Sequence, residues 1–331
     1  MKQEDLIPLL SKINSHILHE DSPDVSIVPC SFDAKYSLIS STDFFTPVSQ
    51  NPYIQGRIAI ANVLSDLYAV GVTHIDTVLM ILTLSTIMPT DARDIVTSEM
   101  IRGFVDGCKR AGTVCSGGQT VHNPWPLIGG TASSMVHSES IVRPDRAEPG
   151  DVLVLTKPLG TQIIGNLALW MLDDSRWNGV VSQLIDEQTA KRAVSVGEES
   201  MMRLNVNAAR VMSEVGAHGA TDVTGFGILG HARNLAAVQK NAVDFEITAL
   251  PIIKGLVPLE KGVTIDYRLT QGLSAETSGG LLVVLPAEHV GSFVEKLTAL
   301  GEPGVWTVGR VVEGNREAKI LGRNEIEIID V

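Results

Sequence analysis

Residues 220–232 read ATDVTGFGILGHA, and this stretch decides more about the fold than any other part of the chain. The apolar approach to Asp222 predicts a strand end, and Gly225 and Gly227 allow a tight turn before a helix that starts near Ile228. A carboxylate at such a junction can hold a metal that itself holds a phosphate, and a helix start attracts anions. The alternative is a helix N-cap, because Asp and Thr are preferred caps.

The composition is that of a soluble globular chain long enough for two domains. It has 331 residues, of which 44% are apolar and 19% charged. A net charge of −12 argues against nucleic acid or an anionic membrane as partner, and no apolar run could span a bilayer. The N-terminus has no secretory-signal pattern, and Cys30, Cys108 and Cys115 show no disulfide or metal-ligand spacing. These features predict a cytoplasmic protein.

Strands and helices alternate along the chain and predict two α+β domains. The polar, turn-rich residues 144–150 are the best linker, which gives domains at 1–146 and 147–331. The predicted strands are residues 25–28, 36–41, 78–84, 113–116, 127–136, 152–156, 281–285 and 306–311. The predicted helices are residues 53–70, 91–111, 228–240 and 288–300, with another from 162 and a helical region at 185–215. The strands of the first domain would leave a sheet edge exposed, so we expect that domain to form a symmetric dimer.

The predicted helix at 53–70 carries a second notable carboxylate. It has almost no polar face, and a helix that is apolar on all sides is buried. Asp66 lies near its C-terminal end, where the helix dipole disfavours a negative charge, and an unpaired buried carboxylate is costly. Arg57 lies too far along the helix to neutralise it, so a bridging cation is favoured. The alternative is an ion pair with a Lys or Arg that is distant in sequence.

Two further carboxylates and a glycine pair complete the candidate site. Asp43 ends the hydroxyl-rich segment SLISSTDFF and Asp24 precedes a predicted strand, although either could be a turn or cap residue. A predicted turn follows residue 116 and consists of Gly117, Gly118, Gln119 and Thr120. Its N–H groups could cradle phosphate, although hairpins use the same glycine pair. Because Mg²⁺ is held by one or two carboxylates plus substrate phosphates, the set predicts a metal–nucleotide site without a Walker-type loop.

Several long motifs resemble those of selenophosphate synthetase (selenide, water dikinase), particularly its eukaryotic form. They are STDFFTPV from Ser41, NPYIQGRIAIANVLSDLYAVGV from Asn51, SGGQTVHNPW from Ser116, PGDVLVLTKPLGTQ from Pro149, ATDVTGFGILGHA from Ala220 and ETSGGLL from Glu276. The resemblance runs from about Asp24 to the C-terminus. It implies the aminoimidazole ribonucleotide synthetase-like fold, a homodimer formed through the N-terminal domain, and ATP in a cleft between the domains.

The resemblance also implies a reaction and its residues. The family makes selenophosphate, AMP and phosphate from selenide, ATP and water, and so supplies selenium for selenocysteine. Its Mg²⁺ ligands fall on Asp24, Asp66 and Asp222. Its nucleotide contacts fall on Asp24, Asp43, Asp66 and the four residues Gly117 to Thr120. We expect a loop hydrogen bond for His122 and a helix-start contact for His231, rather than acid–base roles.

One departure from the family concerns its N-terminal Gly-rich loop, which carries a cysteine or selenocysteine and an essential lysine. This chain has no cysteine and no Gly-rich segment before Cys30. We therefore assign no catalytic residue within the chain and expect it to lack the catalytic loop and to make no selenophosphate. Truncation is favoured because Asp24, Asp66 and Asp222 are all present. The alternatives are a non-catalytic nucleotide-binding paralogue and another superfamily member, such as a thiamine-monophosphate kinase.

Overall fold

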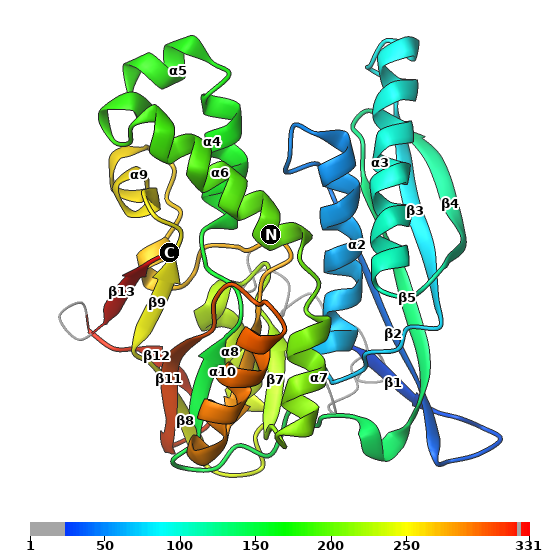
Figure 1. Ribbon diagram of the computed structural model, residues 1–331, viewed down its shortest axis with the longest axis vertical. Coiled ribbons are helices and arrows are strands. Elements are labelled where there is room, and N and C mark those ends of the chain that lie inside the picture. The colour runs from blue at the N-terminus through cyan, green and yellow to red at the C-terminus, as the bar shows by residue number, and fades with distance from the viewer. Residues whose placement is uncertain (1–23, 323–325) are drawn as a thin grey trace, which may run out of the picture.

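The computed structural model describes residues 24–322 and 326–331, which form two α+β domains with helix α2 (Pro52–Ala69) between them (Figure 1). The N-terminal domain contains a five-stranded sheet in the order β1-β2-β5-β3-β4. Its strands are β1 (Ser26–Pro29), β2 (Tyr36–Phe45), β3 (Thr77–Ser85), β4 (Cys115–Asn123) and β5 (Ile128–His137). The β3–β4 pair is parallel and the other pairs are antiparallel. Helices α2 and α3 (Thr90–Arg110) pack on the sheet.

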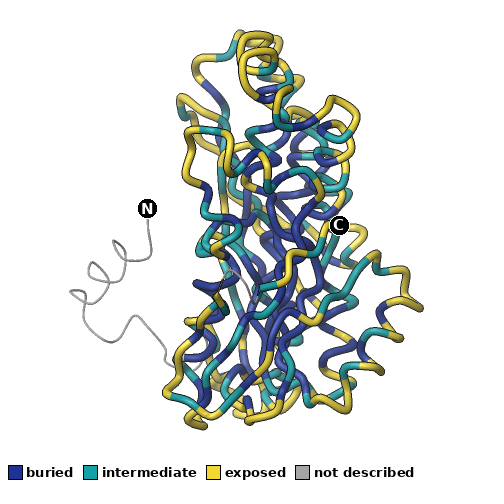
Figure 2. Tube along the Cα trace, turned by 90° about the vertical axis from the view of Figure 1, so that its left-hand side faces the viewer, coloured by how far each residue is buried: buried dark blue, intermediate teal, exposed yellow. Residues whose placement is uncertain are grey.

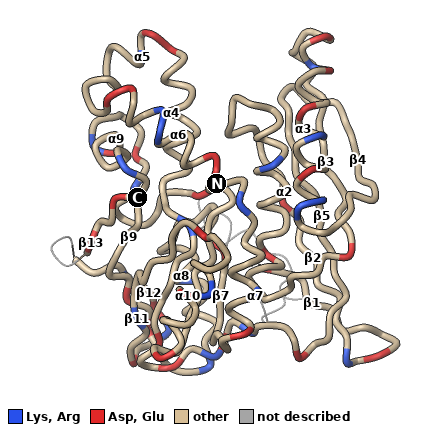
Figure 3. The backbone as a smooth tube through the Cα atoms, in the orientation of Figure 1, with Lys and Arg blue, Asp and Glu red and all other residues tan. Residues whose placement is uncertain are grey.

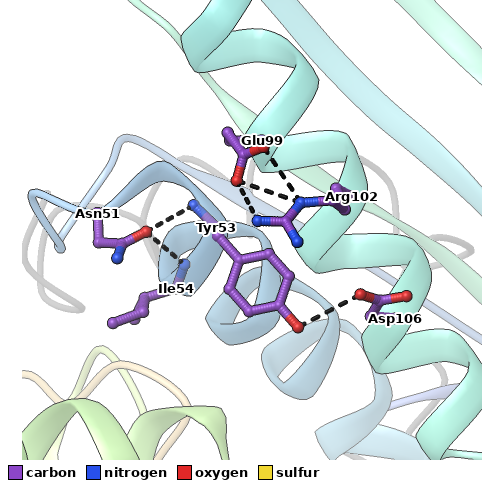
Figure 4. Close-up of polar contacts among 6 residues, drawn as sticks. All are labelled: Asn51, Tyr53, Ile54, Glu99, Arg102 and Asp106. Atoms are coloured by element: carbon purple, nitrogen blue, oxygen red, sulfur yellow. Dashed lines mark hydrogen bonds and ion pairs between the residues drawn. The ribbon is translucent and has the colours of Figure 1, made fainter.

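The start of helix α2 is fixed by an N-cap residue, Asn51, and by contacts of Tyr53 with α3 (Figure 4). Asn51 Oδ1 accepts hydrogen bonds from the N–H groups of Tyr53 and Ile54, at 3.0 and 3.3 Å. The Tyr53 hydroxyl donates to Asp106 Oδ2 at 3.3 Å, and the Arg102 guanidinium lies 4.4 Å from the Tyr53 ring centroid. These contacts fix the start of α2 against α3.

Strand β2 has one face against α2 and one open face. Ile39 is buried, whereas Leu38 and Phe44 are exposed. Side chains alternate along a strand, so Ser41 and Asp43 share the α2 side with Ile39. This alternation directs Asp43 toward the helix that carries Asp66.

The C-terminal domain contains a six-stranded sheet in the order β12-β8-β11-β6-β10-β7. Its strands are β6 (Val152–Leu155), β7 (Gly219–Asp222), β8 (Val243–Ile247), β10 (Leu281–Leu285), β11 (Trp306–Glu313) and β12 (Ala318–Ile320). β9 (Ala249–Ile252) and β13 (Glu327–Asp330) form a separate parallel pair. The helices are α4 (Thr161–Trp170), α5 (Asp174–Gly179), α6 (Glu187–Met202), α7 (Val206–Glu214), α8 (Gly227–Ala237), α9 (Leu256–Gly262) and α10 (Val290–Ala299).

The two domains share a core rather than meeting at a thin interface, and Figure 2 shows a continuous buried interior. One apolar cluster joins Leu64 and Tyr68 of α2 to Val211 of α7 and Phe293 of α10. Burial of one such side chain contributes about 1.5–3 kcal/mol, so α2 fixes the domains to each other. No helix in the described ranges is long and apolar enough to cross a membrane.

The predicted fold class and most predicted elements are confirmed. The buried helix, predicted at 53–70, is Pro52–Ala69, and the strand predicted at 281–285 is Leu281–Leu285. The region at 185–215 divides into α6 and α7. The strand predicted at 113–116 is wrong in its bounds, since β4 covers Cys115–Asn123, and the turn predicted after residue 116 therefore does not exist.

Candidate active site

Four carboxylates from separate elements gather where the two domains meet. Asp24 precedes β1, Asp43 lies in β2, Asp66 lies near the end of α2, and Asp222 ends β7. The first three each interact electrostatically with Asp222. Strand β7 contacts α2, which explains how residues so distant in sequence come together. The structure thus unites all four carboxylates predicted from the sequence.

Two neutral hydroxyl groups donate hydrogen bonds to this cluster. Thr221 Oγ1 donates to Asp24 Oδ1 at 3.0 Å, and Ser41 Oγ donates to Asp66 Oδ2. The second oxygen of Asp24, Oδ2, is buried and has no hydrogen-bond partner among the described residues. Asp222 is only 2% exposed. A carboxylate oxygen withdrawn from water without a donor or a cation is strongly unfavourable.

The electrostatics of the cluster favour a cation. Burial, followed by repulsion from Asp222, raises the pKa of Asp24 and of Asp66 well above the usual range. The same two causes raise the pKa of Asp43, while its hydrogen bond to Asp66 acts in the opposite direction. A nearby positive ion favours the ionised form of a carboxyl and would reverse these shifts. The cluster has the charge pattern of a cation site.

The N-cap explanation for Asp222 is wrong, and the described residues offer no ion-pair partner for Asp66. Helix α8 begins at Gly227 with Phe226 at its N-cap position, so Asp222 ends a strand and caps no helix. Within residues 24–322 and 326–331, no Lys or Arg forms an ion pair with Asp66, whose neighbours are carboxylates and the Ser41 hydroxyl. Asp222 therefore ends a strand and interacts electrostatically with Lys157, whereas Asp66 is a buried acid without a Lys or Arg partner among the described residues.

The carboxylates do not form a closed metal cage. In the part of the chain that the structure describes, no three His, Cys, Asp or Glu side chains are arranged so that they could hold a metal ion. Mg²⁺ usually takes one or two carboxylates, several waters and substrate phosphates, so it needs no such cage. The fit of this site to Mg²⁺ rests on the unpaired Asp24 oxygen and on oxygen ligands alone.

The residues predicted to contact nucleotide separate into two groups. Gly117 to Thr120 lie inside β4. Gly118 has φ +149°, and a Cβ there would lie 1.9 Å from Met80 O on β3, so only glycine fits this position. Strands β5 and β3 separate β2 from β4, so Asp43 and Gln119 are about 14 Å apart at the usual strand spacing. The register places Gln119 on the open face that also carries Phe44. One copy of the chain does not bring the two groups together.

Comparison with known proteins gives the family. Two family models match: AIR synthase related protein, N-terminal domain, over residues 24–136, and AIR synthase related protein, C-terminal domain, over residues 148–322. Selenide, water dikinase of Trypanosoma brucei brucei (strain 927/4 GUTat10.1) is 44% identical over 99% of this chain and 86% of that protein. The chain belongs to the selenide, water dikinase family. Selenide, water dikinase of Dictyostelium discoideum is 42% identical over 94% of this chain and 84% of that protein.

Solved structures of other proteins share the fold. Thiamine monophosphate kinase from Aquifex aeolicus superposes with a TM-score of 0.67 at 20% identity, covering 99% of this chain and 100% of that chain. Hydrogenase maturation protein HypE in complex with ATP gives a TM-score of 0.65 at 16% identity, covering 96% and 88%. At these identities the likeness concerns the fold alone. The sequence relatives favour the dikinase family over the thiamine-monophosphate kinase alternative.

This member of the dikinase family has further residues at the site that sequence reasoning left without a role. Lys157 Nζ donates to Ser278 O at 2.8 Å and to Arg203 O at 2.6 Å, and burial lowers the pKa of Lys157. Asn62 Oδ1, on α2, accepts a hydrogen bond from Ser278 N at 2.9 Å. A lone lysine directly after a buried strand was the available signal for Lys157. No sequence signal identified Ser278.

The remaining predictions for the site have mixed outcomes. His231 Nε2 lies 3.2 Å from Thr224 Oγ1 and 3.4 Å from Phe226 N, which confirms its helix-start contact. His122 lies within β4, so its predicted loop location is wrong. The prediction that the family's Gly-rich loop is missing concerns residues before Asp24, which lie outside the described residues, and it stays a prediction.

Proposed function

We propose that this chain carries the ATP- and Mg²⁺-binding part of a selenide, water dikinase, the enzyme that forms selenophosphate, AMP and phosphate from selenide, ATP and water for selenocysteine synthesis. Without the family's Gly-rich loop and its cysteine, the chain itself is proposed to form no selenophosphate. The observation that carries this proposal is the buried carboxylate cluster with its unpaired Asp24 oxygen. The names of the relatives at 42% and 44% identity support the reaction class. We also infer a cytoplasmic location, supported by the free thiols of Cys30, Cys108 and Cys115.

The carboxylates act as ligands in this proposal. Asp24, Asp66 and Asp222 would hold Mg²⁺ ions, one or two carboxylates to an ion with substrate phosphates as further ligands, and Mg²⁺ when bound neutralises and aligns the triphosphate. Asp43 lies beside Asp66, and the Ser41 hydroxyl, which donates to Asp66 Oδ2, would orient that carboxylate. Thr221 fixes one oxygen of Asp24 and leaves the other for the ion. No proton transfer is assigned to these residues.

The activity is tested with phosphorus NMR on mixtures of the protein, ATP, Mg²⁺ and selenide. We expect this chain, which has no cysteine before Cys30, to bind ATP only when Mg²⁺ is present and to form no selenophosphate. A form extended by a Gly-rich loop with cysteine and lysine should form selenophosphate and AMP. ATP binding without turnover in both forms would favour the paralogue, and transfer to thiamine monophosphate would favour the kinase alternative.

The open face of the N-terminal sheet supports a homodimer. Its exposed apolar side chains are Leu38, Phe44, Leu79, Val121 and Met135. Asp43 is the only Asp, Glu, Lys or Arg in the five strands, which are almost entirely tan in Figure 3. Uncharged, apolar sheet faces of this kind are typical of interfaces between copies. A second copy packed here could supply its Gly117 to Thr120 segment to complete the nucleotide site.

Leu79→Glu is expected to separate the proposed dimer, because it places a charge on the exposed apolar face that the second copy would cover. Sedimentation at micromolar concentration should give monomers, and Mg²⁺-dependent ATP binding should fall with the loss of the partner strand. Leu172→Glu, the same change at a 72% exposed residue of the C-terminal domain, is the control and should stay dimeric. A monomeric wild-type protein would contradict the homodimer.

A further inference from the structure

The turn at residues 276–280 (ETSGG) contains a residue with a strained backbone and a hydroxyl group that makes no hydrogen bond among the described residues. Ser278 has φ 48°, in the left-handed region that residues other than glycine seldom adopt. Its side chain is 1% exposed, and its Oγ has no hydrogen-bond partner within the described ranges. Strain and an unpaired buried polar group in one residue are both unfavourable, and together they are typical of functional positions.

The main chain of this turn is held from both domains. Ser278 N donates to Asn62 Oδ1 at 2.9 Å, and Ser278 O accepts from Lys157 Nζ at 2.8 Å. Asn205 Nδ2 donates to Gly279 O at 2.9 Å. Gly280 cannot carry a side chain, because a Cβ there would lie 2.4 Å from Lys157 N. The surroundings therefore impose the conformation of Ser278 and leave only its hydroxyl free.

The turn lies next to two of the four carboxylates. Asn62 and Asp66 are four residues apart on α2 and so lie on the same side of the helix. On the other side, Asp222 pairs with Leu281 across β7 and β10, three residues after Ser278. Val223 N also donates to Gly280 O at 2.9 Å. Ser278 is thus positioned between the helix that carries Asp66 and the strand that carries Asp222.

We propose that Ser278 is a further ligand-binding residue, whose hydroxyl donates a hydrogen bond to a β- or γ-phosphate oxygen of the Mg²⁺-bound ATP. The inference rests on the proposed function, because it needs a triphosphate at the carboxylate cluster. A phosphate oxygen is an anionic acceptor that would satisfy the idle donor. A buried serine with a purely structural role would instead donate its hydroxyl hydrogen to a protein acceptor, as Ser274 Oγ does to Gln162 Oε1 at 3.0 Å.

Ser278→Ala and Ser274→Ala provide a matched pair of tests. Both serines are at most 3% exposed and lie in the same segment, but only the Ser274 hydroxyl has a partner. We expect Ser278→Ala to weaken Mg²⁺-ATP binding about tenfold or more by calorimetry, the effect of losing a hydrogen bond to a charged group. Its affinity for AMP and its ligand-free melting temperature should not fall. Ser274→Ala should lower the melting temperature and leave ATP affinity unchanged.

Ser278→Gly gives an independent measurement. It removes the hydroxyl and also relieves the positive φ, so it should be at least as stable as wild type and still bind ATP weakly. Unchanged ATP affinity in Ser278→Ala, or equal losses for ATP and AMP, would overturn the phosphate contact while leaving the proposed function intact. Wild-type protein that binds no ATP with Mg²⁺ would overturn both.

Discussion

Replacement of Asp66 by asparagine is expected to raise the melting temperature of the ligand-free protein and to remove tight Mg²⁺-dependent ATP binding. In the ligand-free protein Asp66 is buried beside three other carboxylates, which raises its pKa. At pH 7 it must either stay ionised among like charges or take up a proton, and both options cost folding free energy. Asparagine has the same shape and no charge, so it avoids this cost. Its oxygen can still accept the Ser41 hydrogen bond.

The expected sizes make the experiment decisive. A rise of about 3 °C would correspond to roughly 2 kcal/mol for a chain of this length. Loss of one ionic ligand should weaken ATP binding by about 100-fold, or about 3 kcal/mol. Asp266→Asn, the same change at an exposed carboxylate, should alter neither quantity. A marked fall in the melting temperature of Asp66→Asn would instead mean that Asp66 holds a structural partner.

Strong local signals made much of the fold predictable. The all-round apolar character of α2 predicted its burial, and its observed bounds, Pro52–Ala69, differ by one residue at each end from the prediction. The same predicted burial indicated that Asp66 would be a charge without a local partner and so pointed to a bound cation. The dipeptide Gly117–Gly118 misled the prediction, because glycine serves both turns and close strand contacts. Only the approach of Met80 on β3 distinguishes the two uses.

Long-range geometry limited the prediction of the site. A sequence does not reveal that two strands separate Asp43 from Gln119, because sheet order depends on tertiary packing. Ser278 shows the same limit, since its φ of 48° results from contacts with Asn62 and Lys157, which are more than a hundred residues away. Carboxylates could be found because burying a charge is costly wherever it occurs.

The Glu276 carboxyl is expected to make the free energy of unfolding depend on pH, whereas glutamine at the same position would not. Its carboxylate caps the start of α4, accepting from Gly160 N and Thr161 N, each at 2.8 Å, and from the Thr161 hydroxyl. Burial nevertheless raises the pKa of Glu276 from 4.5 to about 7. The folded protein therefore binds a proton more tightly than the unfolded chain. The resulting stabilisation is fully present below pH 4.5 and is lost as pH rises through about 7.

Glu276→Gln should remove this slope, so the free energy of unfolding of wild type should fall relative to the variant by about 3 kcal/mol between pH 4.5 and 8. The variant should be less stable at acidic pH by about 1–3 kcal/mol, because one amide oxygen cannot serve both backbone N–H groups. Asp186→Asn is the control: Asp186 caps α6 but is exposed, and hydrogen bonding to Thr189 lowers its pKa. The lowered pKa of Asp186 affects stability only at acidic pH. The free energy of unfolding of Asp186→Asn should therefore change with pH in parallel with that of wild type above pH 5. Urea unfolding at a series of pH values measures the free energy of unfolding of all three proteins. If this free energy changes with pH in parallel for wild type and Glu276→Gln, Glu276 stays ionised in its cap and the prediction is wrong.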